Sequence, residues 1–326
     1  MRQLLTDVDG VIEHELMLPV YVVALSLSTG MCITTCSCVF KWTNVWRDPG
    51  HGTMFMLFLM LGLWSFSLLL ITFAVFLNYR SDSLEHPLTL NFSIASEATF
   101  VATSLWLLVA MYEVRRRVMN PRPSFPAAKN HMRWYCLVIH GFTLALVIVL
   151  VVFSQTHLTY TAPDGAQDSL VSWLVSYITW GTWALRLVSL LYAAIVAVAL
   201  QCSKKRVIDQ PRGLLAIVNV FFLLNMPYLV IAPMAEIRAR TNAPTGLIDS
   251  PWALSIMKAL AFCSGIILSL IMGISVGSFD AFYAAKIPAT VANGRSKPLT
   301  HVQTSQDIIF ILGETSSARS TPVENR

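Results

Sequence analysis

Long apolar segments alternate with short polar ones along most of this 326-residue chain. Seven apolar stretches stand out, at residues 16–40, 54–78, 88–112, 134–155, 169–200, 213–234 and 251–276. Each has at least the ~20 residues that an α-helix needs to cross the hydrocarbon core of a bilayer. The pattern therefore predicts an all-α membrane protein, built as a bundle of seven transmembrane helices.

The same pattern divides the chain into three regions. Residues 1–15 form a short polar N-terminal segment, and residues 16–284 form one membrane domain whose loops are too short to hold a water-soluble domain. Residues 285–326 are rich in Pro, Ser and Thr, a composition typical of a disordered tail.

The positive charges of the loops predict the orientation. Twelve Lys and Arg residues lie in the loops after the first, third and fifth stretches, namely Lys41, Arg47, Arg115, Arg116, Arg117, Arg122, Lys129, Arg133, Lys204, Lys205, Arg206 and Arg212. The N-terminal segment and the other loops carry only four, namely Arg2, Arg80, Arg238 and Arg240. Because basic loops stay in the cytosol, we expect the N-terminus outside and the C-terminus inside.

Composition supports a membrane location and limits the partners. The chain is 55% hydrophobic and only 13% charged, which is too apolar for an ordinary soluble domain. Its net charge of +5 does not indicate a nucleic-acid partner, because the excess basic residues lie in loops that face anionic membrane lipids.

Two residues are candidates for modification. Cys202, beside the basic run 204–206, is a candidate for acylation, and Asn91 begins a weak glycosylation signal, Asn-Phe-Ser.

The end of the third stretch carries a recognisable motif. Residues 112–121 read Tyr-Glu-Val-Arg-Arg-Arg-Val-Met-Asn-Pro. This resembles the third helix of rhodopsin-like seven-helix receptors, which has Asp/Glu-Arg-Tyr followed by an aliphatic residue and a proline. The acid, the aliphatic residue and the proline match at Glu113, Val118 and Pro121. Val114 stands where the family has its arginine, and Arg115 lies one residue further, about 100° around the helix. The alternative is a basic loop after an ordinary membrane helix.

The sixth and seventh stretches extend the resemblance. The family's Phe-x-x-Cys-Trp-x-Pro-Tyr pattern is matched at Phe221, Pro227 and Tyr228, and Asn225 replaces the tryptophan. A proline inside a helix removes a backbone hydrogen bond and kinks the helix, which permits movement, although it also occurs as a purely structural feature. Asp280 and Tyr283 resemble the family's Asp/Asn-Pro-x-x-Tyr motif without its proline.

The resemblance implies a receptor that couples to a heterotrimeric G protein. The residues that would carry activation and coupling are Glu113, Arg115, Arg116, Pro227, Tyr228, Asp280 and Tyr283. Other marks of the family are absent: the first stretch has no Asn, the second has no Asp, and no cysteine pair can form the usual outer disulfide. Such departures are typical of orphan or virus-encoded receptor homologues.

Three ionisable residues lie inside the apolar stretches: Glu97, Arg186 and Lys258. Charges in the membrane are costly and usually functional. Glu97 and Lys258 lie in the predicted outer half of their spans and Arg186 lies near the middle of its span, so all three can face one cavity that opens outward. We expect Glu97 to pair with Arg186 or Lys258, and the other cation to meet an anionic group of a ligand. The alternative is an ion-pair network that only fixes the packing of the helices.

No motif in the sequence indicates catalysis, a metal site or a bound cofactor. Serines and threonines of the tail are candidate phosphorylation sites for an arrestin-like partner, and residues 307–312 resemble a signal for a sorting adaptor.

Two other functions stay open. One is a non-signalling seven-span protein that modulates the trafficking or assembly of other membrane proteins. The other is a transporter or channel, which the absence of an internal repeat disfavours.

Overall fold

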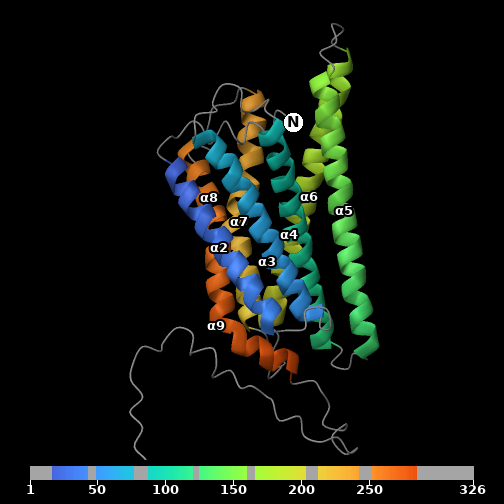
Figure 1. Ribbon diagram of the computed structural model, residues 1–326, viewed down its shortest axis with the longest axis vertical. Coiled ribbons are helices and arrows are strands. Elements are labelled where there is room, and N and C mark those ends of the chain that lie inside the picture. Colours follow the sequence, from blue (N-terminus) through green and yellow to red (C-terminus); the bar gives the residue numbers. More distant parts are fainter. Residues whose placement is uncertain are drawn as a thin grey trace, which may run out of the picture. The chain divides into compact units, whose positions relative to one another are not determined.

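The computed structural model describes residues 17–42, 49–76, 87–119, 125–159, 166–202, 212–241 and 251–284, and omits many side chains near the ends of these segments. The described segments are helical and contain no strand. The helices, labelled in Figure 1, are α2 (Leu18–Trp42), α3 (Pro49–Phe76), α4 (Pro87–Met119), α5 (Phe125–Thr159), α6 (Ala166–Cys202), α7 (Arg212–Thr241), α8 (Pro251–Phe262) and α9 (Ser264–Ala284). The predicted N-terminal segment and C-terminal tail lie outside the described residues.

Seven spans in this part of the chain are long and apolar enough to cross a membrane. The seventh, Trp252–Ser275, runs through both α8 and α9. Only Cys263 separates these two helices, and hydrogen bonds of helical spacing continue across it: Cys263 N–H donates to Ala259 O at 3.1 Å, and Ile267 N–H donates to Cys263 O at 3.2 Å. The predicted fold class is therefore confirmed, and the chain is a multi-pass membrane protein. Its orientation remains a prediction.

Several helices extend beyond the apolar stretches that predicted them. α4 ends at Met119 rather than at residue 112, and α5 begins at Phe125 rather than at residue 134. Hydropathy detects only the part of a helix that contacts hydrocarbon, whereas a helix also continues through the polar interface. Three of the helices start at a proline, at Pro49, Pro87 and Pro251. Proline suits the first turn because its missing N–H has no partner to lose there.

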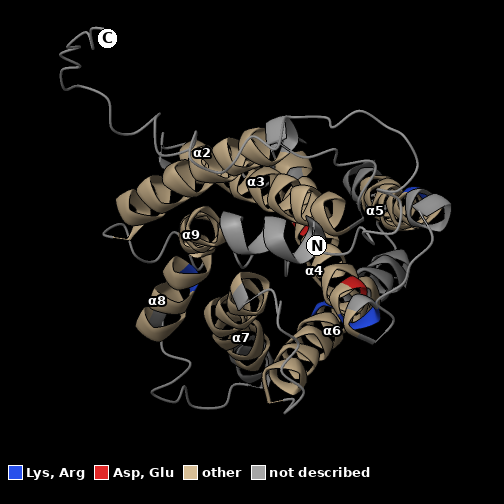
Figure 2. Ribbon diagram, turned by 90° about the horizontal axis from the view of Figure 1, so that it is seen from below, with Lys and Arg blue, Asp and Glu red and all other residues tan. Residues whose placement is uncertain are grey.

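Six helical spans form a ring and one lies outside it. Around the ring, α2 packs on α3, α3 on α4, α4 on α6, α6 on α7, α7 on α8, and α8 back on α2. The remaining helix, α5, packs on α4 and makes smaller contacts with α3 and α6. Figure 2, seen from below, shows this arrangement, with α5 beyond the ring beside α4.

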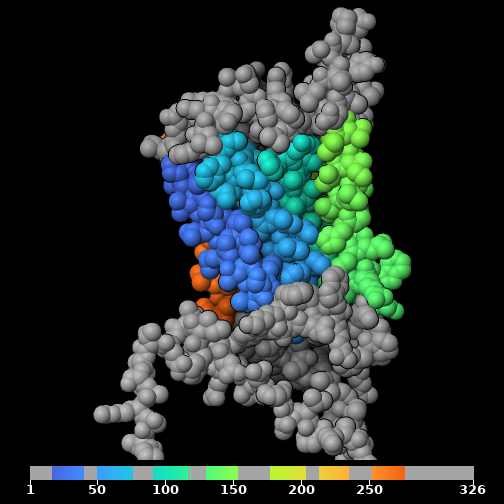
Figure 3. All heavy atoms as spheres, viewed as in Figure 1, coloured from blue at the N-terminus to red at the C-terminus, as the bar shows by residue number. Residues whose placement is uncertain are grey.

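Burial follows from this arrangement. In an apolar 18-residue segment of the α4 span, 67% of residues are buried, compared with 17% in the corresponding segment of α5. Figure 3 shows α4 as a narrow strip between α3 and α5. The outward face of α5 is apolar, as expected of a surface that faces lipid, with exposed Leu137, Val138, Phe142, Leu144 and Ile148. α4 is therefore the central helix, and polar groups on it meet protein rather than lipid.

Small residues bring α2 close to α3 and α9. Ser28 Oγ lies 3.0 Å from Ser65 Oγ, which joins α2 to α3 by a hydrogen bond. Gly265 faces Ser28 and Cys32 so closely that a Cβ at this position would lie 2.9 Å from Cys32 Sγ and overlap Ser28 Oγ. Small residues at such contacts let helix backbones approach, and this contributes to packing in a membrane, where the hydrophobic effect does not drive helices together.

Candidate functional site

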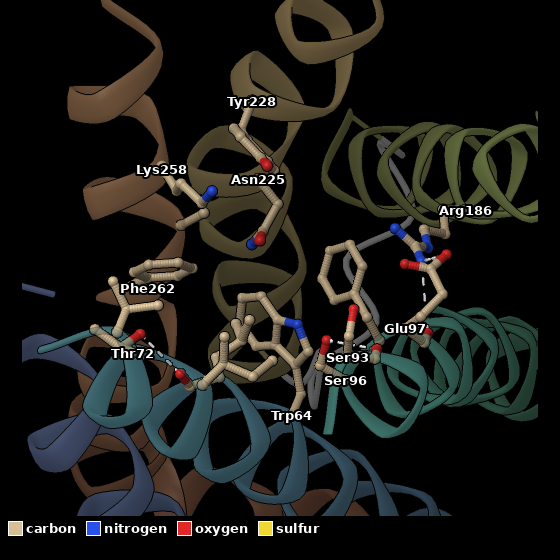
Figure 4. A pocket seen from close by; sticks show the side chains of 15 residues that line it. Trp64, Thr72, Ser93, Ser96, Glu97, Arg186, Asn225, Tyr228, Lys258 and Phe262 are labelled. Carbon is tan, nitrogen blue, oxygen red and sulfur yellow. Dashed lines mark hydrogen bonds and ion pairs between the residues drawn. The ribbon is translucent and has the colours of Figure 1, made fainter. Parts of the chain in front are cut away.

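A cavity of about 100 Å³ lies between five helices of the bundle (Figure 4). Its lining comes from α3, α4, α6, α7 and α8, and consists of Trp64, Leu68, Ile71, Thr72, Val75, Ser93, Ser96, Glu97, Phe100, Arg186, Asn225, Tyr228, Lys258, Ala261 and Phe262. All three ionisable residues singled out from the sequence are among them. Residues 97, 186 and 258 are far apart along the chain, so the fold itself gathers them.

Glu97 and Arg186 form an ion pair between α4 and α6. Thr182 Oγ1 donates a second hydrogen bond to Glu97 Oε1, at 3.1 Å, and the guanidinium of Arg186 lies 4.8 Å from the centre of the Phe100 ring. The two charged side chains are only 14% and 12% exposed, respectively. Of the two partners predicted for Glu97, Arg186 is therefore the one it contacts.

Lys258 occupies the opposite side of the cavity from the ion pair, as Figure 4 shows. Its side chain is buried, and its Nζ lies 5.8 Å from the centre of the Tyr228 ring on α7. An ammonium over an aromatic face is stabilised by the ring quadrupole. Trp64 stacks on Phe100 at 4.8 Å and touches the edge of Phe262, so aromatic rings form the wall between the two charged ends.

Asn225 adds a polar group to the cavity. The sequence showed it only as the residue that replaces the family's tryptophan. Its side chain is 1% exposed and lines the cavity. Asn225 Nδ2 donates to Phe221 O at 2.9 Å within α7, whereas Asn225 Oδ1 has no hydrogen-bond partner among the residues that the structure describes. A buried carbonyl oxygen without a donor is costly. The cavity is therefore suited to a water or ligand group that can donate a hydrogen bond here.

Two prolines, Pro227 and Pro233, lie inside α7. Pro233 cannot donate the usual hydrogen bond to Leu229 O. Instead, Trp183 Nε1 on α6 donates to this oxygen at 2.7 Å. Sequence reasoning identified Pro227 but missed Pro233 and Trp183. The proline itself was a visible signal, but the donor that compensates for it depends on how α6 and α7 face each other.

The size of the cavity limits what it holds in this conformation. A volume of about 100 Å³ is below the ~300–1,000 Å³ of typical small-molecule sites, and water takes ~30 Å³ per molecule in the liquid. Only a few waters or a very small ligand fit. A larger ligand requires the surrounding helices to move apart.

A second charged group lies near the other end of α4. The Glu113 carboxylate is fully buried; it accepts a hydrogen bond from Tyr135 Oη on α5, at 2.6 Å, and pairs with Arg116 Nη2 at 2.8 Å. Val114, at the position of the family's arginine, is completely buried in the core, whereas Arg115 is exposed. The residue that faces the bundle interior here is therefore apolar, and no arginine whose side chain the structure describes takes its place.

Cys202 and Asn91 do not join either group. Cys202 is exposed at the end of α6, and Asn91 is exposed near the start of α4. Asp280 and Tyr283 lie on the backbone of α9, but their side chains are outside the described residues. Within the part of the chain that the structure describes, no group of His, Cys, Asp and Glu could hold a metal ion.

No protein-family model matches this chain, and no curated protein matches it in sequence.

Proposed function

We propose that this chain is a divergent rhodopsin-like membrane receptor. The cavity between α3, α4, α6, α7 and α8 is its candidate ligand site, and α7 is its moving part. Its inner loops would bind a heterotrimeric G protein, and an arrestin-like or sorting adaptor would bind the tail. The observation that carries this proposal is the convergence of Glu97, Arg186 and Lys258 on one cavity beside a helix that contains two prolines.

Two features make this cavity more than a packing defect. Charged side chains inside a membrane are costly, and they tend to mark ligand or ion sites. The Oδ1 atom of Asn225, on the kinked helix, lacks a hydrogen-bond donor. A ligand that donates to Asn225 contacts α7 directly, so its binding free energy can favour one position of α7 over another. This differential contact is what a two-state switch requires.

A cell assay of G-protein activation tests the receptor proposal. We expect basal activation above that of vector-transfected cells, and we expect Pro227→Ala to lower it because an alanine N–H can bond to Leu223 O and stiffen α7. A shift of about 1 kcal/mol between two states changes their ratio roughly five-fold. Surface expression is measured in parallel. Activation at the vector level, with normal surface expression, would contradict the proposal.

The ligand role of the cavity has its own test. Glu97→Gln, Arg186→Gln and Lys258→Met each remove one charge, and we expect all three to alter activation at equal surface expression. Leu191→Met, on the exposed side of α6, is the matched control and should leave activation unchanged. If the three charge variants lose surface expression but signal normally per surface molecule, the charges only stabilise packing.

One observation favours a second function, that of a non-signalling protein that modulates the trafficking or assembly of other membrane proteins. Val114 is buried where the family's arginine would lie, and Glu113 is engaged by Arg116 and Tyr135. This end of α4 therefore has a closed, locally satisfied arrangement. Under this function, G-protein activation stays at the vector level, while removing the protein changes the surface amounts of other membrane proteins.

A further inference from the structure

One turn of α6, residues 182–186, contacts two helices at once. Thr182 and Arg186 are four residues apart, so they share one face of α6, and both contact Glu97 of α4. Trp183 lies about 100° around the helix from Thr182 and contacts α7. This turn, which we call the α6 bridge, therefore has polar contacts with both α4 and α7.

The contact with α7 exists because of Pro233. In a regular helix, the N–H of residue 233 would donate to Leu229 O, but proline has none. Trp183 Nε1 donates to this oxygen from 2.7 Å. In a membrane interior, few other donors are available for a freed carbonyl. The indole N–H thus replaces a bond inside α7 with a bond between α6 and α7.

The contacts of Arg186 with Glu97 hold the α6 bridge against α4. Arg186 pairs with the carboxylate of Glu97, and its Nη2 also lies 3.5 Å from Glu97 O. These contacts set the rotation and height of the bridge relative to α4. Because Trp183 is on the same helical turn, a shift of the ion pair also shifts the indole against α7.

We infer that the α6 bridge couples the Glu97–Arg186 ion pair to the proline-containing part of α7, with Trp183 as the positioning residue and the carbonyl freed by Pro233 as its acceptor. This coupling would supply a route from the cavity to the moving helix of the proposed receptor. Measurements of thermal stability and hydrogen exchange test this coupling without any signalling. The coupling and the receptor function can therefore fail independently.

A double-mutant cycle tests the bond in purified protein in nanodiscs. Trp183→Phe keeps an aromatic ring and removes the N–H. We expect its apparent melting temperature to fall by at least about 2 °C. Trp180→Phe makes the same chemical change one turn away and should have a smaller effect. In a Pro233→Ala background, the N–H of the introduced alanine can donate to Leu229 O, so the effect of Trp183→Phe should largely disappear.

A Pro227→Ala background provides the matched control. It restores a donor to Leu223 O rather than to Leu229 O, so the effect of Trp183→Phe should persist. An equal fall in melting temperature in the wild-type, Pro233→Ala and Pro227→Ala backgrounds would overturn the role assigned to Pro233. So would an equal effect of Trp180→Phe and Trp183→Phe.

Hydrogen exchange of α7 tests the coupling itself. Glu97→Gln weakens the ion pair between α4 and α6 and changes no residue of α7. We expect it to increase exchange of backbone amides around residue 229, and we expect Trp183→Phe to do the same. The Glu97→Gln change should add little in a protein that already carries Trp183→Phe. Unchanged exchange of α7 in Glu97→Gln, or full additivity of the two changes, would refute the coupling.

Discussion

The two carboxylates of α4 are neutralised in different ways. Glu97 pairs with Arg186 on another helix, at the cavity, whereas Glu113 pairs with Arg116 of its own helix and accepts a hydrogen bond from Tyr135 on α5. An unpaired buried charge costs several kcal/mol, so each carboxylate needs its partners. The pair at Glu97 joins two helices of the ring, while the group at Glu113 fastens the outer helix α5 to the central one.

Removing the Tyr135 hydroxyl should loosen this attachment. Tyr135→Phe keeps the ring but takes away one of the two hydrogen bonds that the Glu113 carboxylate accepts from described residues. Hydrogen bonds to charged groups contribute about 1.5–3 kcal/mol, and we expect a loss of stability in this range, measured by thermal unfolding in detergent.

Tyr112→Phe is the matched control, because Tyr112 precedes Glu113 on α4 and its side chain is 46% exposed. Exposed substitutions of this kind usually change stability by less than about 0.5 kcal/mol. Similar stabilities of Tyr135→Phe, Tyr112→Phe and the wild type would show that Glu113 does not depend on Tyr135.

Helix α7 shows what the sequence predicts about an element and what it does not. Its span and the kink-forming Pro227 follow from hydropathy and residue type. The partner of Leu229 O does not, because which indole faces a freed carbonyl depends on the rotation of α6 against α7. The charged residues of the cavity lie between these two cases, because the sequence identifies them but does not show how they pair. Their positions along the spans predict that Glu97, Arg186 and Lys258 can face one cavity, but the choice of Arg186 as the partner of Glu97 requires the packed helices.

The contact of α2 with α9 should tolerate no added side-chain atom at Gly265. In Gly265→Ala, the new Cβ would overlap Ser28 Oγ and lie 2.9 Å from Cys32 Sγ, so the helices must separate or the side chains must move. Overpacking of this kind costs about 1–3 kcal/mol, which we expect to find as lower thermal stability.

Gly273 provides the control on the same helix. It has no neighbouring atom within 4 Å of a Cβ placed there, so Gly273→Ala should be neutral or slightly stabilising. Ser28→Gly should restore part of the stability that Gly265→Ala loses. A Gly265→Ala protein as stable as Gly273→Ala would mean that α2 and α9 are not in close contact.

At the scale of the whole molecule, the number of spans was predictable and their neighbours were not. Hydropathy identifies each span because every transmembrane helix must present apolar side chains to lipid. It carries little information on which helices touch. The placement of α5 outside the ring depends on contacts such as that of Tyr135 with Glu113, which join residues 22 positions apart. The fact that the span of α5 is only 17% buried became visible only in the folded bundle.

The direction of the bundle in the membrane follows from loop charge, and it decides which side reaches the cavity. With twelve basic residues in one set of loops and four on the other side, we expect an epitope tag before Met1 to be accessible on intact cells. A tag after Arg326 should become accessible only after permeabilisation.

Replacing six basic residues with Gln should produce a mixture of both orientations, namely Arg115, Arg116, Arg117, Lys204, Lys205 and Arg206. Replacing Arg238 and Arg240 with Gln should leave the orientation unchanged. An N-terminal tag that is hidden in intact cells would reverse the orientation, and the cavity would then lie in the cytosolic half of the membrane.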